Sequence, residues 1–386
     1  MTGPDMKGRL VYPYSSSLLK YEFSKTHPLK PDRLRLTFEL SKMLGLIEKV
    51  ELVEPTPATR EDLEMFHTPD FIDAVIRCKT DSRINAVYGL GISDNPIFPE
   101  LFEAASMYVG ATLEAADRIV NGRDRAFVIS GGLHHAQRSE ASGFCIFNDI
   151  VLGIMRIRKK VPCRVLYFDF DAHHGDGVQN AFYRSKDVLT ISVHQSGKTL
   201  FPGTGFVYEC GAAEGLGYSV NVPLLPGAGT PELIRTFEEI VVPLFESFRP
   251  DLVVTQQGVD GHYLDPLAHL ALTSHGYEHV LRRLMDLTSQ CRLGWLALGG
   301  GGYHLVNVAR LWSLFLAILL DEKVPDHIPD EFLQSLPDYG YEHIPTTMRD
   351  PDQVVSMYLP REQIELDLDR VIRRLRELVF PYHGLA

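Results

Sequence analysis

Short apolar runs alternate with longer amphipathic stretches along most of this 386-residue chain. The short runs are rich in β-branched and aromatic residues, and the longer stretches have helical periodicity. A parallel β-sheet whose strands are joined by crossover helices produces this alternation. We therefore predict an α/β fold with strands over residues 126–130, 165–170, 188–193, 252–255 and 295–298.

Several helix starts are marked by a threonine that precedes an aspartate or a proline. A Thr-x-x-Asp spacing is typical of a capping box, and a Thr-Pro pair places an N-cap before a first-turn proline. These signals are Thr59 with Asp62, Thr68 with Pro69, and Thr230 with Pro231. Two later helices are predicted over residues 274–291 and 306–320.

The chain contains no repeat, low-complexity tract or obvious linker. We therefore predict one domain over residues 1–386, with a motif-bearing core over about 20–320 and a C-terminal extension over about 321–386.

The composition excludes several classes of protein. A formal net charge of -12, without a long Lys/Arg block, argues against a nucleic-acid partner. The apolar stretch 311–320 contains Ser313 and has about half the length of a bilayer span, so we predict no membrane insertion. Five scattered cysteines without a CxxC pair predict free thiols. Residues 1–17 lack the pattern of a secretory signal, so we expect a cytoplasmic location.

Four of the predicted strands end in a burst of Gly, His, Asp, Gln or Tyr instead of an ordinary polar turn. The carboxyl ends of parallel strands form one edge of a sheet, where ligands bind. We therefore expect the four bursts to meet at one site. They are Gly131-Gly132-Leu133-His134-His135, Asp171-Ala172-His173-His174-Gly175-Asp176, Gln256-Gln257-Gly258-Val259-Asp260 and Gly299-Gly300-Gly301-Gly302-Tyr303-His304.

The alternation of Asp169, Asp171 and His173 indicates a metal site. Residues two apart in extended backbone point to the same side, so three potential ligands share one direction. A capping aspartate and one hydrogen-bonded histidine would explain two of them, but not all three. With Asp260 from another strand end, the sequence offers an Asp, His, Asp set that leaves a position open for water and substrate. Such a set suits zinc, and also iron(II), cobalt or manganese.

Other residues near the predicted metal could carry out acid–base chemistry. The adjacent histidines His134 and His135 could accept a proton from water and donate one to a departing amine. The carboxylates of Asp169 and Asp176 are placed to orient imidazoles. Tyr303 follows four glycines, and we expect it to stabilise a tetrahedral oxyanion, although a surface tyrosine after a glycine turn is the alternative. The glycine run lacks the Lys-Ser/Thr of a P-loop, which argues against nucleotide binding.

The chain resembles the histone deacetylase family in five motifs that occur in the same order: HHAQRSEASGFCIFND, YFDFDAHHGDGVQNAFY, FPGTG, GVD and GGGGYH. The resemblance extends from His27 to about Arg310. It implies the arginase/deacetylase fold, with three α/β/α layers around a parallel eight-stranded sheet. It also implies hydrolysis of the amide of acetyl-lysine or a related acylated amine. Residues 261–266 are similar to the bacterial branch, which includes acetoin-utilisation deacetylases, so histones are a poor candidate for the substrate.

The resemblance also implies a role for particular residues. It makes Asp171, His173 and Asp260 the zinc ligands, His134 and His135 the paired imidazoles supported by Asp169 and Asp176, and Tyr303 the residue that polarises the amide carbonyl. The substrate-binding residues would be Asp94 at the rim, Gly143, Phe144 and Phe201 in the tunnel walls, Leu267 near the mouth, and Arg33 below the metal. Structural potassium ions would be held by Asp169, Asp171, His173, Ser192 and Val193, and by Phe182, Val188 and Tyr218.

Two other functions remain open from the sequence. The first is another amidohydrolase, either a deacetylase of acetylated polyamines or an arginase-like enzyme with two manganese ions. The second is a catalytically silent module that binds acyl-lysine without cleaving it. The expected partner is therefore an acetylated lysine protein or a small acylated amine, and the sequence does not predict an oligomeric state.

Overall fold

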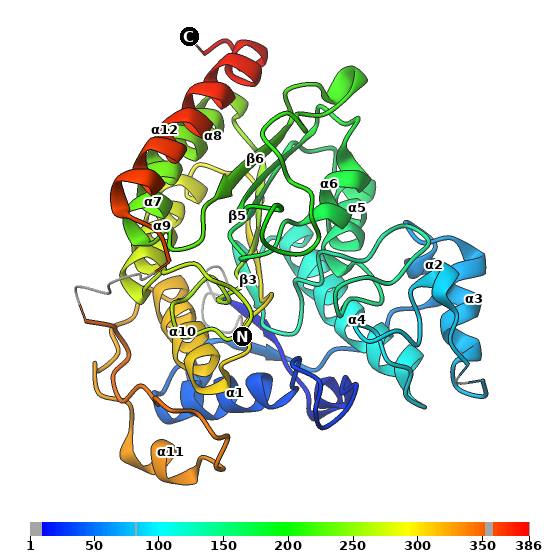
Figure 1. Cartoon of the computed structure of the whole chain (residues 1–386). Coiled ribbons are helices and arrows are strands. Elements are labelled where there is room, and N and C mark those ends of the chain that lie inside the picture. Colours follow the sequence, from blue (N-terminus) through cyan, green and yellow to red (C-terminus); the bar gives the residue numbers. More distant parts are fainter. Residues whose placement is uncertain (1–9, 82, 352–357, 386) are drawn as a thin grey trace, which may run out of the picture.

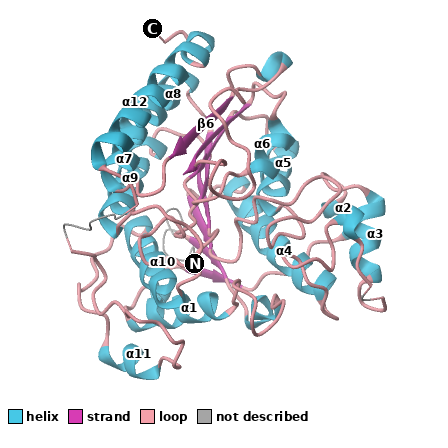
Figure 2. Ribbon diagram, viewed as in Figure 1, coloured by secondary structure: helices cyan, strands magenta, loops and turns pink. Residues whose placement is uncertain are grey.

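The computed structural model describes residues 10–81, 83–351 and 358–385. Eight parallel strands form one sheet, in the order β2-β1-β3-β8-β7-β4-β5-β6. Figures 1 and 2 show this sheet in the middle of the molecule, between layers of helices. The strands are β1 Val11–Pro13, β2 Glu51–Val53, β3 Arg125–Val128, β4 Val165–Asp169, β5 Val188–Gln195, β6 Ser219–Leu224, β7 Leu252–Gln256 and β8 Gly294–Leu298.

Helices cover both faces of the sheet. In Figure 2, α4, α5 and α6 lie on one side of the sheet, and α7, α8, α9 and α12 lie on the other. Helices α1 and α10 pack against each other. The helices are α1 Asp32–Met43, α2 Arg60–Leu63, α3 Pro69–Arg77, α4 Leu101–Val120, α5 Asp149–Lys160, α6 Asp176–Phe182, α7 Thr230–Thr236, α8 Val242–Phe248, α9 Ser274–Thr288, α10 Leu305–Leu319, α11 Asp330–Ser335 and α12 Arg361–Leu378.

The five strands predicted from the sequence are all present, with ends that differ by no more than two residues. Strands β1, β2 and β6 were not found by periodicity. The first two have only three residues each, and β6 contains Pro223, which an edge strand tolerates because one side of its backbone needs no partner. Helix α9 ends at Thr288, three residues before the predicted end, and α10 begins and ends one residue before its prediction.

Two of the three predicted helix caps are confirmed. Thr59 forms a capping box at α2, and Thr68 is the N-cap of α3, although its side chain makes no capping hydrogen bond. The prediction that Thr230 caps α7 is wrong, because Gly229 is the N-cap and Thr230 is the first helical residue. The carboxylate of Glu232 accepts the Gly229 N–H at 2.8 Å and supplies the capping bond from inside the helix.

The core lies between the sheet and its two helical layers. Every residue of β4, β7 and β8 is buried, as expected of strands covered on both faces. Every residue of α10 is also buried, which accounts for its apolar sequence. Among the described residues, no helix combines the length and the apolar character needed to cross a bilayer.

The C-terminal extension is anchored to the core by one carboxylate. Asp350 accepts hydrogen bonds from Arg310 Nη2 at 2.8 Å, His262 Nε2 at 2.8 Å and the Ser274 N–H at 2.7 Å. Burial alone would raise the pKa of Asp350, but the bond from His262 and the charge of Arg310 hold it well below its usual range. The carboxylate is therefore an ionised anchor that joins the extension to α9, α10 and the loop after β7.

Replacement of this anchor is expected to destabilise the fold. Asp350→Ala leaves the guanidinium of Arg310, which is 0% exposed, without its buried counter-charge, and the free energy of unfolding should fall by about 3–5 kcal/mol. Urea unfolding at neutral pH measures the change. The control is Glu103→Ala, which removes an exposed ion pair with Lys79 and should cost less than about 1 kcal/mol. Equal effects of the two substitutions would contradict the buried-anchor interpretation.

Candidate active site

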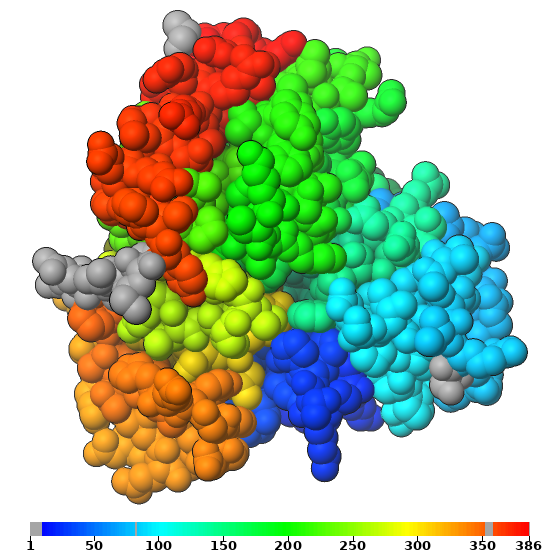
Figure 3. Space-filling model, in the orientation of Figure 1, coloured from blue at the N-terminus to red at the C-terminus, as the bar shows by residue number. Residues whose placement is uncertain are grey.

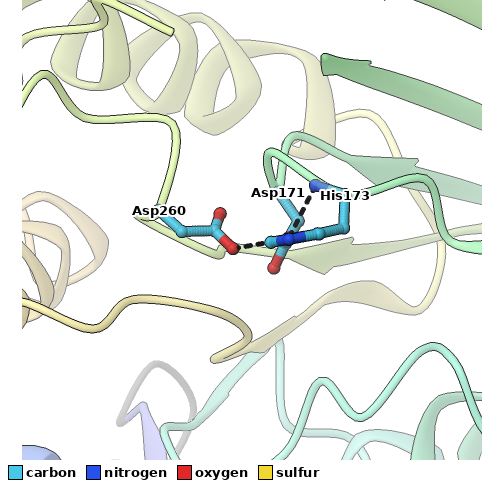
Figure 4. A group of neighbouring side chains, drawn as sticks. All are labelled: Asp171, His173 and Asp260. Atoms are coloured by element: carbon cyan, nitrogen blue, oxygen red, sulfur yellow. Dashed lines mark hydrogen bonds and ion pairs between the residues drawn. The ribbon is translucent and has the colours of Figure 1, made fainter. Parts of the chain in front are cut away.

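Four adjacent strands of the sheet, β3, β8, β7 and β4, deliver the predicted site residues to one edge. Asp171 and His173 follow β4, and Asp260 follows β7. Their ligand atoms lie within 4.8 Å of one another, and all three residues are buried. His173 Nδ1 lies 3.1 Å from Asp171 Oδ1 and 2.9 Å from Asp260 Oδ2, as the dashed lines in Figure 4 show. Two carboxylates and one imidazole therefore converge on a common point.

Backbone amides and one glutamine fix the two carboxylates. Asp171 Oδ2 accepts from Gln256 Nε2 at 2.6 Å and from the Gly301 N–H at 2.7 Å, and Asp260 Oδ1 accepts from the Ala172 N–H at 2.7 Å. A Cβ atom on Gly301 would lie 2.1 Å from Asp260 Oδ2, so only glycine permits this approach. The glycine run after β8 is therefore required beside the carboxylates.

The negative charge of Asp171 and Asp260 around His173 favours a bound cation. For Asp260, burial and then the nearby charge of Asp171 raise the pKa to about 6. For His173, burial is outweighed by hydrogen bonds to both carboxylates, which raise its pKa to about 10. The charge of Asp171 contributes to the first shift, and both carboxylates cause the second. A divalent ion bound by these three side chains would neutralise that charge, so the donor set fits the predicted metal.

The two adjacent histidines each have their own carboxylate. His134 Nδ1 donates to Asp169 Oδ2 at 2.8 Å, and His135 Nδ1 donates to Asp176 Oδ1 at 2.7 Å. Their Nε2 atoms lie 3.0 Å apart and face each other. His134 Nε2 is also 3.9 Å from Asp171 Oδ1, which places the pair beside the predicted metal ligands.

The environments of the two histidines separate their protonation states. Burial lowers the pKa of His134, but the charges of Asp169 and Asp171 outweigh it and raise that pKa to about 9. For His135, burial and the neighbouring charge of His134 lower the pKa to about 4. With Nε2 atoms in contact, one imidazole is protonated and the other is neutral. His135 is therefore the neutral imidazole, and its Nε2 carries the lone pair.

Tyr303 follows the glycine run and lines the same cavity as Arg33, His134 and His135. Its pKa is raised well above the usual value by burial and by the charge of Asp260, so the phenol stays protonated and can donate a hydrogen bond. The Arg33 guanidinium is buried and donates to the Gly300 carbonyl.

The cavity is narrow, at about 20 Å³, and the rings of Phe144 and Tyr303 line it, whereas Phe201 is exposed outside this lining. Phe144 packs edge-on against Tyr303 at 5.9 Å, and Phe201 packs edge-on against His135 at 4.9 Å. Phe144 has a left-handed backbone with φ of 67°, which is strained for a bulky residue, and Tyr21 Oη donates to its carbonyl at 2.8 Å. Gly143 has no room for a side chain, because a Cβ there would lie 2.5 Å from His135 Cδ2.

The remaining predicted substrate residues lie further from the metal ligands. The Asp94 carbonyl is 3.3 Å from Nε2 of His27, whose ring packs against Phe144. Leu267 is half-buried, and its N–H donates to Asp265 Oδ1 at 2.9 Å. The structure thus connects Asp94 to the aromatic wall through His27, and Leu267 to the loop after Asp260 through Asp265.

The predicted potassium residues lie on neighbouring elements. Asp169 pairs with Ser192 across β4 and β5, and Ser192 Oγ lies 2.8 Å from His194 Nδ1. In the second set, the Tyr218 carbonyl accepts the Thr190 N–H at 3.0 Å. Val193 of the first set lies in β5. Of the second set, Val188 begins β5 and Phe182 ends α6.

The cluster of Asp171, His173 and Asp260 is present as predicted, but the backbone that carries it differs from the predicted one. Strand β4 ends at Asp169, so Asp171 and His173 lie in the bends that follow it and not in extended strand. Asp169 instead binds His134 and accepts a 2.6 Å hydrogen bond from Tyr167 Oη. The alternating spacing was therefore a correct signal for the cluster, and the assumed strand was too long.

Sequence reasoning assigned no role to three side chains that support the site. Gln256 holds Asp171, Gln137 Nε2 donates to Asp176 Oδ2 at 2.9 Å, and Asp265 Oδ2 accepts the Tyr303 N–H at 2.8 Å. The position of Gln256 at the end of a buried strand was a usable signal. Asp265, five residues after Asp260, gave no periodic signal.

The chain is similar to known proteins over most of its length. A family model described as "Histone deacetylase domain" matches residues 27–319. The chain is 41% identical to the acetoin utilization protein AcuC of Bacillus subtilis (strain 168) over 325 residues, which cover 82% of this chain and 84% of that protein. It is 39% identical to histone deacetylase 9 of Arabidopsis thaliana over 330 residues, or 84% of this chain and 76% of that protein.

Solved structures share the fold. The crystal structure of an HDAC homolog from Aquifex aeolicus superposes with a TM-score of 0.84 at 32% identity, covering 95% of this chain and all of that one. An HDAC homolog complexed with SAHA gives the same TM-score at 31% identity, with the same coverage of both chains.

The chain belongs to the histone deacetylase family: it has the arginase/deacetylase fold, and it is a deacetylase that hydrolyses amide bonds. Within that family it falls in the bacterial acetoin-utilisation branch, since it is also 36% identical over 371 residues to AcuC of Staphylococcus xylosus, or 93% of this chain and 95% of that protein. The predicted family and fold are therefore confirmed.

The free energy of unfolding should depend on pH through His67, a buried histidine that bonds to Asn148 behind the His134–His135 pair. His67 is 2% exposed, and its Nε2 accepts the Asn148 N–H at 3.0 Å, while Asn148 Nδ2 donates to the Ala136 carbonyl. Burial lowers the pKa of His67 to about 3, so the unfolded chain, with an ordinary pKa near 6.5, binds this proton more tightly. Stability is therefore fully present above pH 6.5 and is lost as the pH falls toward 3, by up to about 1.4 kcal/mol per pH unit from this group.

Urea unfolding curves recorded at about one-unit intervals between pH 4 and pH 8 measure this dependence. His67→Gln keeps an acceptor for Asn148 but does not titrate, so its stability should fall less steeply below pH 6.5 than that of the wild type. Parallel curves for the two proteins would show that His67 does not contribute.

Proposed function

We propose that this enzyme is a zinc-dependent deacetylase that hydrolyses the amide of acetyl-lysine, in a protein or in a small acylated amine, to a free amine and acetate. The observation that carries the proposal is the buried Asp171, His173 and Asp260 cluster, with ligand atoms within 4.8 Å, beside the His134–His135 pair. A set with no thiolate and an open side is typical of catalytic zinc. A divalent ion held there supplies Lewis acidity to the substrate carbonyl and to water.

Two histidines of the chain then accept, hold and donate the protons that the reaction requires. His135 is neutral and faces the cavity, so it accepts a proton from the attacking water and returns it to the departing amine. His134 stays protonated between Asp169 and His135, and it contributes positive charge near the reaction centre. Asp176 keeps the Nδ1 proton on His135, which leaves Nε2 as the acceptor.

Tyr303 and the aromatic wall act on the substrate. The protonated phenol donates to the carbonyl oxygen as negative charge develops there. Phe144, Phe201 and Gly143 leave a passage narrow enough for an unbranched methylene chain. Asp94 and Leu267 are proposed to contact the substrate outside the passage, and Arg33 to line the space in which acetate is released.

Other features of the proposal concern the whole molecule. Structural potassium is proposed at the two sets of residues around β5. Residues 1–386 are proposed to act as one domain, because Asp350 of the extension is bonded to Arg310 of the core. A cytoplasmic location is proposed because all five cysteines are free thiols, as the sequence predicted, and free thiols are typical of a reducing compartment.

The function is tested by acetate release from an acetyl-lysine peptide and from acetylspermidine. The purified enzyme should release acetate from the peptide, be inhibited by a hydroxamate, lose activity when a chelator removes the metal, and regain that activity with zinc. Iron(II), cobalt and manganese are added in parallel, and metal analysis gives the native ion. Preference for acetylspermidine would favour a polyamine deacetylase. Binding of the peptide without acetate release, in metal-loaded protein, would contradict the proposal.

Substitution of the two histidines separates their roles. His135→Ala removes the proton acceptor and should lower kcat by about 10²–10⁴-fold. His134→Ala removes only a nearby charge and should have a smaller effect. His279→Ala, at a half-buried residue of α9 that bonds to Glu238 at 3.0 Å, serves as the control and should leave kcat unchanged. Near-wild-type kcat in His135→Ala would contradict the assignment of the base.

A further inference from the structure

The backbone of Tyr303 is held from two sides by side chains. Its N–H donates to Asp265 Oδ2 at 2.8 Å. Its carbonyl accepts from Tyr341 Oη at 3.3 Å, and the same hydroxyl accepts the Leu305 N–H at 3.0 Å. One tyrosine hydroxyl therefore bridges the residue that ends the glycine run and the first residue of α10.

The Tyr341 ring has little freedom to move. It stacks on His304, with ring centroids 3.9 Å apart and an interplanar angle of 15°. His304 Nδ1 accepts the Asn307 N–H and caps α10, so its Nε2 carries the proton and donates to the His343 carbonyl at 3.0 Å. The residue after Tyr303 and the segment around Tyr341 are thus locked together, and this fixes the position of the hydroxyl.

Tyr341 lies outside the part of the chain that the family model matches. That match ends at residue 319, whereas Tyr341 belongs to the extension between α11 and Asp350. Residues 321–351 of the extension, orange in Figure 3, lie along one side of the face shown. The buried anchor at Asp350 holds the segment nine residues further on, so the segment around Tyr341 is attached to the core at His304 and again at Arg310.

The glycine run before Tyr303 has to be fixed by hydrogen bonds to other parts of the chain. Four glycines precede Tyr303 and offer no side chains to pack, so the loop is held only through its backbone, as in the bonds of Gly300 to Arg33 and of Gly301 to Asp171. A donor to a developing oxyanion contributes only if its position is fixed before the reaction. Hydrogen bonds to the Tyr303 backbone are the means that the structure provides.

We propose that Tyr341 is a positioning residue for Tyr303, so that the C-terminal extension supplies part of the active site. This inference rests on the oxyanion role proposed above for Tyr303. Asp265 fixes the N–H side of Tyr303 from the loop after β7, and Tyr341 fixes its carbonyl side from the extension. Loss of either bond lets the phenol move relative to the metal ligands.

The test begins with Tyr341→Phe in the metal-loaded full-length enzyme. This variant keeps the ring stacked on His304 and removes only the hydroxyl. We expect kcat to fall about tenfold and KM for an acetyl-lysine peptide to change less than about twofold, because the phenol is misplaced mainly for the transition state. The matched control is Tyr339→Phe, whose buried hydroxyl makes no hydrogen bond within the described residues and which should keep wild-type kcat.

A double-mutant cycle separates positioning from a general effect on folding. Tyr303→Phe alone should lower kcat about 100-fold, and adding Tyr341→Phe to it should lower kcat by less than about twofold, because the positioned hydroxyl is already absent. Titration of sites with a tight hydroxamate gives the folded fraction, so rates are compared per folded site.

Each outcome of the cycle is decisive. An equal tenfold loss in both backgrounds would overturn the positioning role, as would a wild-type kcat in Tyr341→Phe when Tyr303→Phe is impaired; the proposed function would then stand. A wild-type kcat in Tyr303→Phe would remove the oxyanion role itself, and the inference with it. A loss confined to the background that retains Tyr303 supports the proposal.

Discussion

Negative charge concentrated at one buried point is the constraint on which the site depends. Asp171 and Asp260 approach the same imidazole inside a sheet edge that excludes water, an arrangement that is unfavourable unless donors or a cation compensate for it. The fold provides the donors as backbone amides and the Gln256 amide. These groups lie at the end of β7 and in the turns after β4 and β8.

The same charge makes two neighbouring histidines different. His134 lies closer to Asp171 and pairs with an aspartate that is 0% exposed, whereas His135 pairs with Asp176, which is 14% exposed and shared with Gln137. Two identical side chains, one residue apart, therefore hold opposite protonation states. Acid–base chemistry at one site requires such a separation, and here it follows from the distance of each ring to the buried carboxylates.

The sequence predicted the parts of the structure that have a local signature. Central strands with continuous apolar runs and the spacing of Asp171 and His173 were sufficient to predict the sheet and the cluster. Edge strands β2 and β6 were missed because short or proline-containing strands lack that periodicity. Tyr341 and Asp350 could not be predicted, since their partners lie about 40 to 90 positions away and no local pattern marks such contacts.

The strand order has a consequence for how the molecule is assembled during synthesis. Strand β8 is inserted between β3 and β7, although both of these precede it in the chain. Until residues 294–298 leave the ribosome, β3 and β7 each expose an unpaired backbone edge, and the sheet exists as two separate halves. The histidines after β3 and the ligands after β4 and β7 therefore meet only when this late strand closes the gap between the two halves.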